Sequence, residues 1–404
     1  MSTFKKVFTC LLMGVLTPSI ALAGNMVSDF MDGEASGSFR LRFENADADD
    51  GTKDSAQALT LRTRLLYHAK GMNGISAHFE FEDVRALLGV NDYFDKGVVS
   101  NGKTNYDTIA DPEMTELNEA YLKYNTNSLE IKAGKQRIVY DNMRFVGHVG
   151  WRQDDQTFDA LKGTYTSGDM VLSAAYIDQV NGINGDYSKI DKNDVLINTG
   201  FKLGGMGKLS GYVYQLDNKD LDEQLGTYGV RFKGKTDVGL PVNYTAEFAT
   251  QTKETTTAAD RDATYLLIEG GATMAGVNAT LGMETLGSDD GAYGFSTDLA
   301  TKHAFNGWAD IFLGTPSEGL QDIYVKVGTK VAGVKLLGVY HDFSADDDSI
   351  TGADDFGDEL DLLAVKKLEN GVTLGFKYAT YSAGDAATGK VDTDKVWLWT
   401  QVSF

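Results

Sequence analysis

The last ten residues of the chain form the segment that most restricts its fold. Along this segment, apolar side chains alternate with other residues up to a terminal aromatic. One face carries Val396, Leu398, Val402 and Phe404, and the other carries Lys395, Gln401 and Ser403. A chain end usually frays in water, whereas a transmembrane β-strand crosses a bilayer in about 9–11 residues with every second side chain in lipid. The pattern favours a membrane strand, and an ordinary sheet strand that closes the chain is the alternative.

The first residues have the layout of a secretory signal peptide. Lys5 and Lys6 precede an apolar stretch, and Ala21-Leu22-Ala23 offers a small-residue cleavage site,. We therefore expect residues 1–23 to be removed and residues 24–404 to form one outer-membrane barrel domain. Cys10 is the only cysteine, so the mature chain can form no disulfide.

Composition excludes two other classes of protein. After Leu22 no run of about 18 apolar residues occurs, which excludes a bundle of membrane helices. A formal net charge of −21 without a basic stripe argues against nucleic-acid binding,.

Alternation with a period of two repeats along the whole chain and predicts about 18 strands joined alternately by short turns and long polar loops. The predicted strands are 37–45, 57–68, 73–85, 114–125, 128–139, 156–167, 169–179, 193–204, 206–217, 225–236, 241–252, 262–274, 276–286, 319–331, 333–344, 357–369, 371–382 and 393–404. The fold class is therefore all-β, a transmembrane antiparallel up-and-down β-barrel. An even strand number places both termini and the short turns on the periplasmic side. The alternative, a large soluble β-sandwich, is disfavoured because the polar rows are too charged for a dry core.

Charged residues on the polar faces of the first strands are the candidate functional residues. Neighbouring strands lie about 4.8 Å apart, so arginines of the first two strands form a basic patch beside glutamates of the third. The candidate pore-lining or constriction residues are Arg40, Arg42, Arg62, Arg64, Glu80, Glu82, Arg85, Arg137, Arg144 and Arg152. Arginine offers a permanently charged fork to carboxylates and phosphates. These arginines either select anionic solutes or brace the wall by pairing with the glutamates, and the two roles are compatible.

The segment from Gly134 to Asp159 is the most distinctive part of the sequence. It reads GKQRIVYDNMRFVGHVGWRQDDQTFD and, with Ala110-Asp111-Pro112-Glu113 and the segment 305–310 (FNGWAD), resembles the alginate-export family of outer-membrane barrels. The resemblance implies an 18-stranded barrel in the outer membrane of a Gram-negative cell. It also implies an arginine-lined pore, to which Arg137, Arg144 and Arg152 would belong. Many relatives are general porins, and this compact chain has no long periplasmic turn.

Three functions follow from these observations. The first is a diffusion channel for small hydrophilic solutes, with anions such as sugar acids preferred. The second is an export channel for alginate or another polysaccharide. The third, a barrel-embedded hydrolase, is remote because no nucleophile elbow is present, and we expect no enzyme activity. The five histidines show no metal-ligand spacing,, so we expect neither a metal site nor a cofactor.

The expected partners follow from the expected location. They are the lipid bilayer and lipopolysaccharide, small polar solutes, a secretion channel that reads the signal peptide, and a barrel-insertion machine that reads the strand ending in Phe404.

Overall fold

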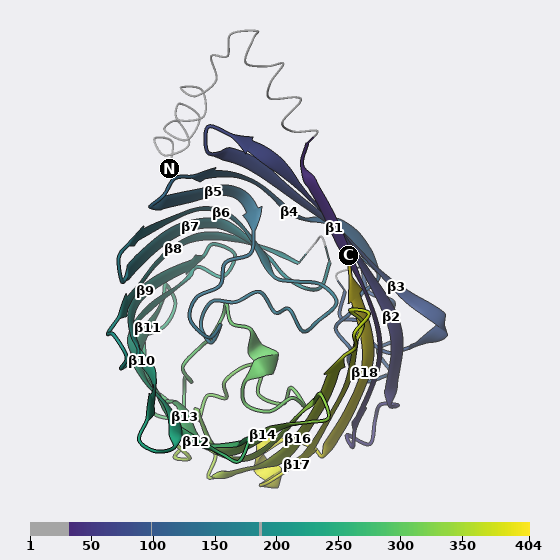
Figure 1. Ribbon diagram of the computed structural model, residues 1–404. Coiled ribbons are helices and arrows are strands. Elements are labelled where there is room, and N and C mark those ends of the chain that lie inside the picture. Colours follow the sequence, from purple (N-terminus) through teal and green to yellow (C-terminus); the bar gives the residue numbers. More distant parts are fainter. Residues whose placement is uncertain (1–31, 98, 186–187) are drawn as a thin grey trace.

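The computed structural model describes residues 32–97, 99–185 and 188–404. Within these ranges one antiparallel sheet of 18 strands closes into a barrel, because β1 (Glu34–Ala48) pairs with both β2 (Ala56–Met72) and β18 (Thr393–Ser403). Figure 1 shows this closed ring of strands. The expected signal peptide at residues 1–23 lies outside the described residues, as does the beginning of the expected barrel domain.

Each strand pairs with its neighbours in the sequence, so the barrel is of the up-and-down type. The strands between β2 and β18 are β3 (Ile75–Asp92), β4 (Met114–Asn125), β5 (Leu129–Gln136), β6 (Thr157–Ser167), β7 (Met170–Asn181), β8 (Lys189–Lys202), β9 (Lys208–Asn218), β10 (Glu223–Asp237), β11 (Pro241–Thr255), β12 (Arg261–Met274), β13 (Val277–Leu286), β14 (Leu320–Val331), β15 (Val334–Ser344), β16 (Asp355–Lys367) and β17 (Thr373–Ser382). In the part of the chain that the structure describes, two short 3₁₀ helices, η1 (Lys302–Ala304) and η2 (Ala386–Thr388), lie in loops.

The predicted strands are confirmed, with differences at some ends. β3 continues to Asp92 instead of residue 85, and its pairing with β2 shifts register there. Leu88 and Gly89 have φ values of 56° and 74° at this irregularity, as expected for a bulge that adds residues to one strand. β5 ends at Gln136 instead of residue 139 because the chain then turns into the barrel.

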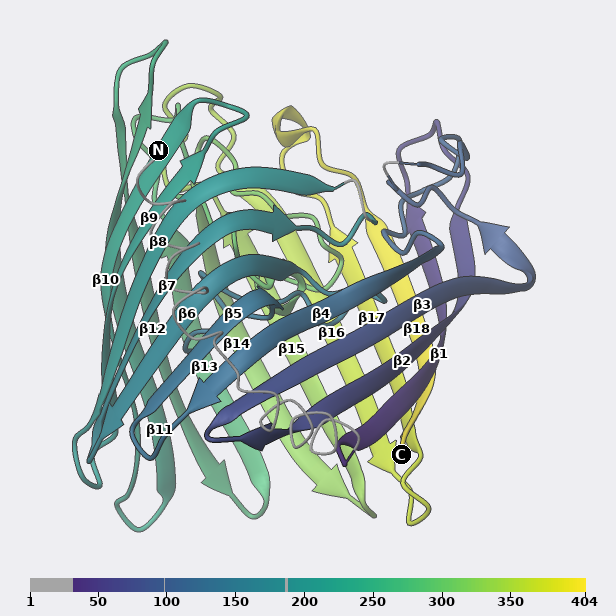
Figure 2. The ribbon, with the colours of Figure 1, turned by 90° about the horizontal axis from the view of Figure 1, so that it is seen from above.

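The short turns owe their geometry to residues with positive φ. Asn73-Gly74, Ala275-Gly276 and Ala332-Gly333 each join consecutive strands with both φ values between 48° and 83°. This is the conformation of a two-residue type I′ turn, whose twist matches that of the flanking strands. Figure 2 shows the short turns at one end of the barrel, together with the C-terminus, and the long loops at the other.

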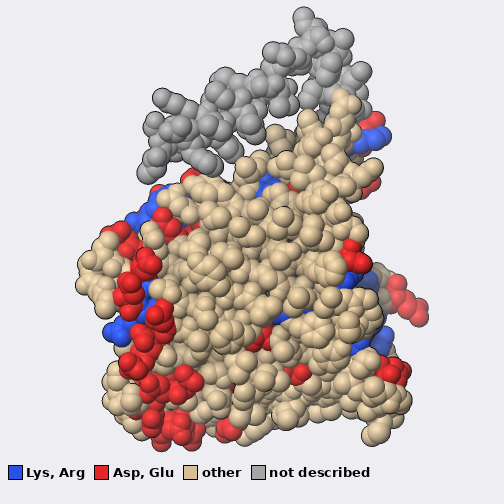
Figure 3. Space-filling model, turned by 90° about the vertical axis from the view of Figure 1, so that its left-hand side faces the viewer, with Lys and Arg blue, Asp and Glu red and all other residues tan. Residues whose placement is uncertain are grey.

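The outer wall is apolar. On β1, Phe39 faces outward and is 40% exposed, whereas its neighbour Arg40 is 7% exposed and faces the interior. Leu65, Phe81 and Phe248 are among the exposed residues of other strands. Figure 3 shows the broad uncharged surface on the side formed by β7–β11, with Asp and Glu gathered along one edge. Among the described residues, no helix is long and apolar enough to cross a membrane.

Two long connections fold into the barrel and fill much of its interior. The connection between β5 and β6 (residues 137–156) and that between β13 and β14 (residues 287–319, with η1) lie inside the ring of strands (Figure 1). Side chains from both connections, including Phe145 and Phe295, pack with inward-facing strand residues such as Tyr265 in one buried cluster. These two inward connections position the candidate site.

Candidate functional site in the barrel interior

The inward rows of β1, β2 and β3 bring the predicted arginines and glutamates together. Arg40 on β1 is the cross-strand partner of Arg62 on β2, and Arg64 on β2 is the partner of Glu82 on β3. Glu80 and Glu82 are both buried. Alternation along each strand places these side chains on the face opposite the lipid-facing residues.

The first inward connection covers this charged group. Arg40 Nε donates a hydrogen bond to Gln153 Oε1 at 2.9 Å, and Arg42 Nη1 donates to the Trp151 carbonyl at 2.5 Å. Gln153 Nε2 in turn donates to Thr60 Oγ1 at 2.7 Å. Residues 150–153 therefore lie against the inner face of β1 and β2, although the connection that carries them begins at the end of β5.

Most of the arginines pair with carboxylates. Arg42 contacts Asp111 and lies 3.3 Å from Glu44. Arg152 Nη1 lies 2.9 Å from Glu44 Oε1, and its Nη2 lies 2.9 Å from Asp310 Oδ2 on the second inward connection. Such pairs hold their geometry only when the surrounding hydrogen bonds are also made. Here the Trp151 carbonyl accepts from Arg42, and the Gln153 backbone amide donates to Asp111.

Asp155 joins two further arginines. Its Oδ1 lies 2.9 Å from Arg64 Nη2, and its Oδ2 lies 2.5 Å from Arg137 Nε. Burial alone would raise the pKa of Asp155, but the charges of Arg64 and Arg137 outweigh it and lower that pKa,. Arg137 also contacts Glu80 and Glu119, so a single guanidinium links β3, β4 and the connection.

Arg40 and Arg62 differ from these arginines because neither forms an ion pair with a carboxylate of the described residues. Arg40 is satisfied by the Gln153 side chain and by the Gly150 and Arg152 carbonyls. The hydrogen bond found for Arg62 is a 3.5 Å contact from Nη1 to the Gln153 carbonyl, and its buried Nε has no partner. Arg62 is only 4% exposed. An unpartnered buried donor is costly, so an anionic group would be favourable here.

Two predicted site residues lie elsewhere. Arg144 lies on the first inward connection but points to β13, where its Nε is 2.8 Å from Glu284 Oε1 and its Nη2 donates to Asn306 Oδ1 at 2.7 Å. Arg85 shares the outward row of β3 with exposed Phe81 and contacts Asp83 and Thr115. Its place in the alternation of β3 separates Arg85 from the inward-facing Glu82.

A second cluster, not anticipated from the sequence, joins the two inward connections to β17 and β18. Lys377 Nζ lies 4.0 Å from the ring centre of Trp151 and 3.9 Å from that of Trp308. Trp397 and Trp399 both contact Trp151 edge-on, so the four tryptophans of the chain gather in one place. The pairing of Gly with Trp at 150–151 and 307–308 was the signal available in the sequence.

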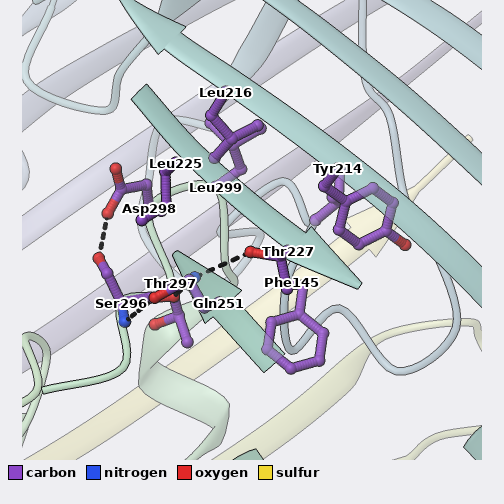
Figure 4. Close-up of a pocket in the computed structure, with 11 residues that line it drawn as sticks. Phe145, Tyr214, Leu216, Leu225, Thr227, Gln251, Ser296, Thr297, Asp298 and Leu299 are labelled. Carbon is purple, nitrogen blue, oxygen red and sulfur yellow. Dashed lines mark hydrogen bonds between the residues drawn. The ribbon is translucent and has the colours of Figure 1, made fainter. Parts of the chain in front are cut away.

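On the opposite wall the same connections pack closely against β9–β11. Figure 4 shows Gln251 of β11 directed at the second inward connection. Its Nε2 donates to Thr227 Oγ1 and to the Ser296 carbonyl, each at 2.9 Å. The cavity between Phe145, Tyr214 and residues 296–299 has a volume of about 10 Å³, too small for a solute.

The described residues contain one group with metal-ligating potential. Ligand atoms of His78, Glu80 and Glu119 lie within 4.8 Å of one another. The group is formed across β3 and β4, so spacing along the chain could not have shown it. Arg137 already contacts both glutamates, and this cation makes the site a poor one for a metal.

The family model described as alginate export matches residues 34–286, more than half of the chain. The chain belongs to the alginate export family. This confirms the resemblance seen in the sequence, although no curated protein matches the chain.

Solved structures confirm the fold of this alginate export family member as that of 18-stranded outer-membrane porins. Pseudomonas aeruginosa OccK9 (OpdG) superposes with a TM-score of 0.72 at 13% identity, covering 93% of this chain and 99% of its own. Acinetobacter baumannii OccAB4 gives 0.72 at 13% identity, with 92% and 98% covered. Pseudomonas aeruginosa OpdK, solved with vanillate, gives 0.69 at 12% identity, with 93% and 99% covered. The protein is a porin-like barrel of the outer membrane.

Proposed function

We propose that this barrel is a diffusion channel for small hydrophilic anions such as sugar acids, with its termini and short turns on the periplasmic side. The observation that carries the proposal is the buried pair Arg40 and Arg62, which face each other across β1 and β2 without carboxylate partners. A fixed positive charge buried beside a watery passage lowers the energy of an anion and raises that of a cation.

The neighbouring ion pairs support this selectivity by holding the arginines in place. Arg42, Arg64 and Arg152 are fixed by Asp111, Asp155 and Glu44, so they brace the wall on either side of Arg40 and Arg62. Some of the predicted arginines thus brace the wall, whereas Arg40 and Arg62 select the solute. A guanidinium offers a carboxylate two parallel hydrogen bonds, and the OpdK structure with vanillate shows that a barrel of this fold can hold a carboxylate compound.

Export of an acidic polysaccharide is the second candidate, and the alginate export family match is the observation that favours it. The two inward connections argue for small solutes, because they occupy the interior and are fixed to β1, β11 and β17 by hydrogen bonds. A polymer would need both connections to move aside.

Liposome swelling separates the two candidates. The refolded mature protein should admit gluconate faster than an uncharged sugar of the same size and should exclude a uronic-acid oligomer of about ten units. Equal rates for gluconate and the neutral sugar would contradict anion preference. Rapid entry of the oligomer would favour export.

Two expected partners fit the same proposal. The apolar outer wall suits lipid and lipopolysaccharide,. The terminal residue Phe404 closes the seam between β18 and β1, which is where an insertion machine would read the last strand.

A further inference from the structure

A second group of cations lines the barrel interior near the short turns of β8–β10, away from the arginines of β1 and β2. Lys208 on β9 is the cross-strand partner of both Lys202 on β8 and Lys233 on β10. Like charges placed directly opposite each other destabilise a sheet. Three lysines in one row therefore indicate a role other than holding the sheet together.

A cavity lies over this row. Its volume is about 170 Å³, and it is lined by Asp141, Asn142, Lys208, Ser210, Arg231 and Lys233. A water molecule takes about 30 Å³ in the liquid, so the cavity has room for a carboxylate or phosphate group with part of its carrier. The lining charges are three positive and one negative.

The partners of these cations leave part of the positive charge without compensation. Arg231 contacts Glu247, and Lys208 Nζ lies 3.0 Å from Asp141 Oδ1. Lys233 forms no ion pair with any carboxylate in the described part of the chain, and its side chain is exposed. Lys233 is therefore the cation that an incoming anion would meet first.

Asp141 is fixed at the edge of the cavity by three hydrogen-bond donors. Its carboxylate accepts hydrogen bonds from Asn198 Nδ2 and Ser210 Oγ, each at 2.8 Å, as well as from Lys208. Burial raises the pKa of Asp141, but these three donors outweigh it and lower that pKa, so the group stays charged. Its φ of 48° is unusual for a residue other than glycine, and backbone strain of this kind is typical of functional loops.

We propose that this cavity is a second anion-binding site, which takes the carboxylate or phosphate group of a solute on the turn side of the arginine pair. Lys233 and Lys208 supply the charge, and Asn142 lies beside them as a further donor. The proposal rests on the proposed function only in taking a solute to be the source of the anion.

Isothermal titration calorimetry of the refolded mature protein at low ionic strength tests the site without requiring conduction. Inorganic phosphate and gluconate are titrated separately, which distinguishes a phosphate site from a carboxylate site. We expect saturable binding of at least one of them, weakened about tenfold in Lys233→Gln, because a hydrogen bond to a charged group is lost. Lys326→Gln is the matched control, since Lys326 is another interior lysine and pairs with Glu269, and its affinity should equal that of the wild type.

A gain of affinity provides a test that misfolding cannot imitate. Asp141→Asn removes the one lining carboxylate while keeping its shape, and should strengthen binding about threefold, the scale of a partly exposed charge pair. Absence of saturable binding, or equal affinities in Lys233→Gln and Lys326→Gln, would overturn the proposal. Binding lost in Arg62→Gln but kept in Lys233→Gln would also overturn it, while leaving the proposed function intact.

Discussion

Lys377 Nζ lies 2.8 Å from His303 Nε2, and His303 Nδ1 lies 2.6 Å from Asp310 Oδ1. The ammonium donates to Nε2 and the ring donates from Nδ1, which requires a neutral imidazole. Trp151 stacks on the His303 ring with centroids 4.9 Å apart. His303 therefore ties the second inward connection directly to β17, and Trp151 adds the first inward connection to the same contact.

The pH dependence of this contact follows from His303. Burial lowers the pKa of His303 to about 3, against the raising effect of Asp310. An unfolded histidine has a pKa of about 6.5. Because the pKa of His303 is lower in the folded protein than in the unfolded chain, neutral His303 stabilises the folded protein fully above about pH 6.5. This stabilisation is lost as the pH falls toward 3.

We therefore expect tryptophan fluorescence to change between pH 6.5 and 3. Protonated His303 is repelled by Lys377, and the packing of the four tryptophans around it loosens. His303→Gln should flatten this change. His68→Gln is the control, because His68 lies near a short turn and contacts His78 rather than a tryptophan. A profile in His303→Gln identical to that of the wild type would contradict the assignment.

Replacing Arg42 should destabilise the barrel strongly. Arg42→Met leaves Asp111 and Glu44 buried without one of their cations, and breaking a buried pair in this way costs about 3–5 kcal/mol. Arg85→Met is the matched control, since its pair with Asp83 is partly exposed and should contribute less than about 1 kcal/mol. Unfolding by guanidinium chloride measures both, and similar losses in the two variants would be incompatible with the buried network.

Gly375 tests the packing of the tryptophan cluster. A Cβ at this position would collide with the ring of Trp399, so Gly375→Ala should displace that ring and cost about 1–3 kcal/mol. Gly163→Ala is the control, because a Cβ there meets no atom within 4 Å. The unfolding midpoint and the tryptophan emission of the two variants should differ, and equal midpoints would refute this packing.

Deleting Phe404 should lower the folded yield in the outer membrane. Phe404 exchanges two backbone hydrogen bonds with Gly37, at 2.9 and 3.0 Å, and its ring lies 5.5 Å from that of Phe39. Removing it opens the seam where the barrel closes. Heat-modifiable mobility on gels reports the folded fraction, with Phe404→Tyr as the conservative comparison. Undiminished yield after deletion would show that barrel assembly does not depend on Phe404.

The barrel was predictable because residues close together in the sequence determine where each strand and each tight turn lies. Alternation along a strand such as β1 separates Phe39 from Arg40 whatever the rest of the chain does, and an Xaa-Gly turn such as Asn73-Gly74 fixes where a hairpin reverses. The bulge at Leu88 was missed because the residues beyond it resemble an ordinary loop.

The site was only partly predictable because it depends on contacts between distant segments. Cross-strand neighbours such as Arg64 and Glu82 follow from the register of adjacent strands. The partner of Arg42 is Asp111 in the connection between β3 and β4, and the partner of Lys377 is His303 in the second inward connection. Nothing in the period of the sequence indicates where such a connection lies inside a barrel.

We propose that Arg40 and Arg62 make this channel selective for anions. The most direct measurement is the single-channel reversal potential of the refolded mature protein in a planar bilayer under a potassium chloride gradient. We predict that the wild type has a reversal potential of the sign expected for chloride permeation. This potential should be smaller in Arg62→Gln and unchanged in Arg85→Gln, because the side chain of Arg85 lies on the outer face of β3. Cation preference in the wild type, or equal potentials in all three proteins, would contradict the account.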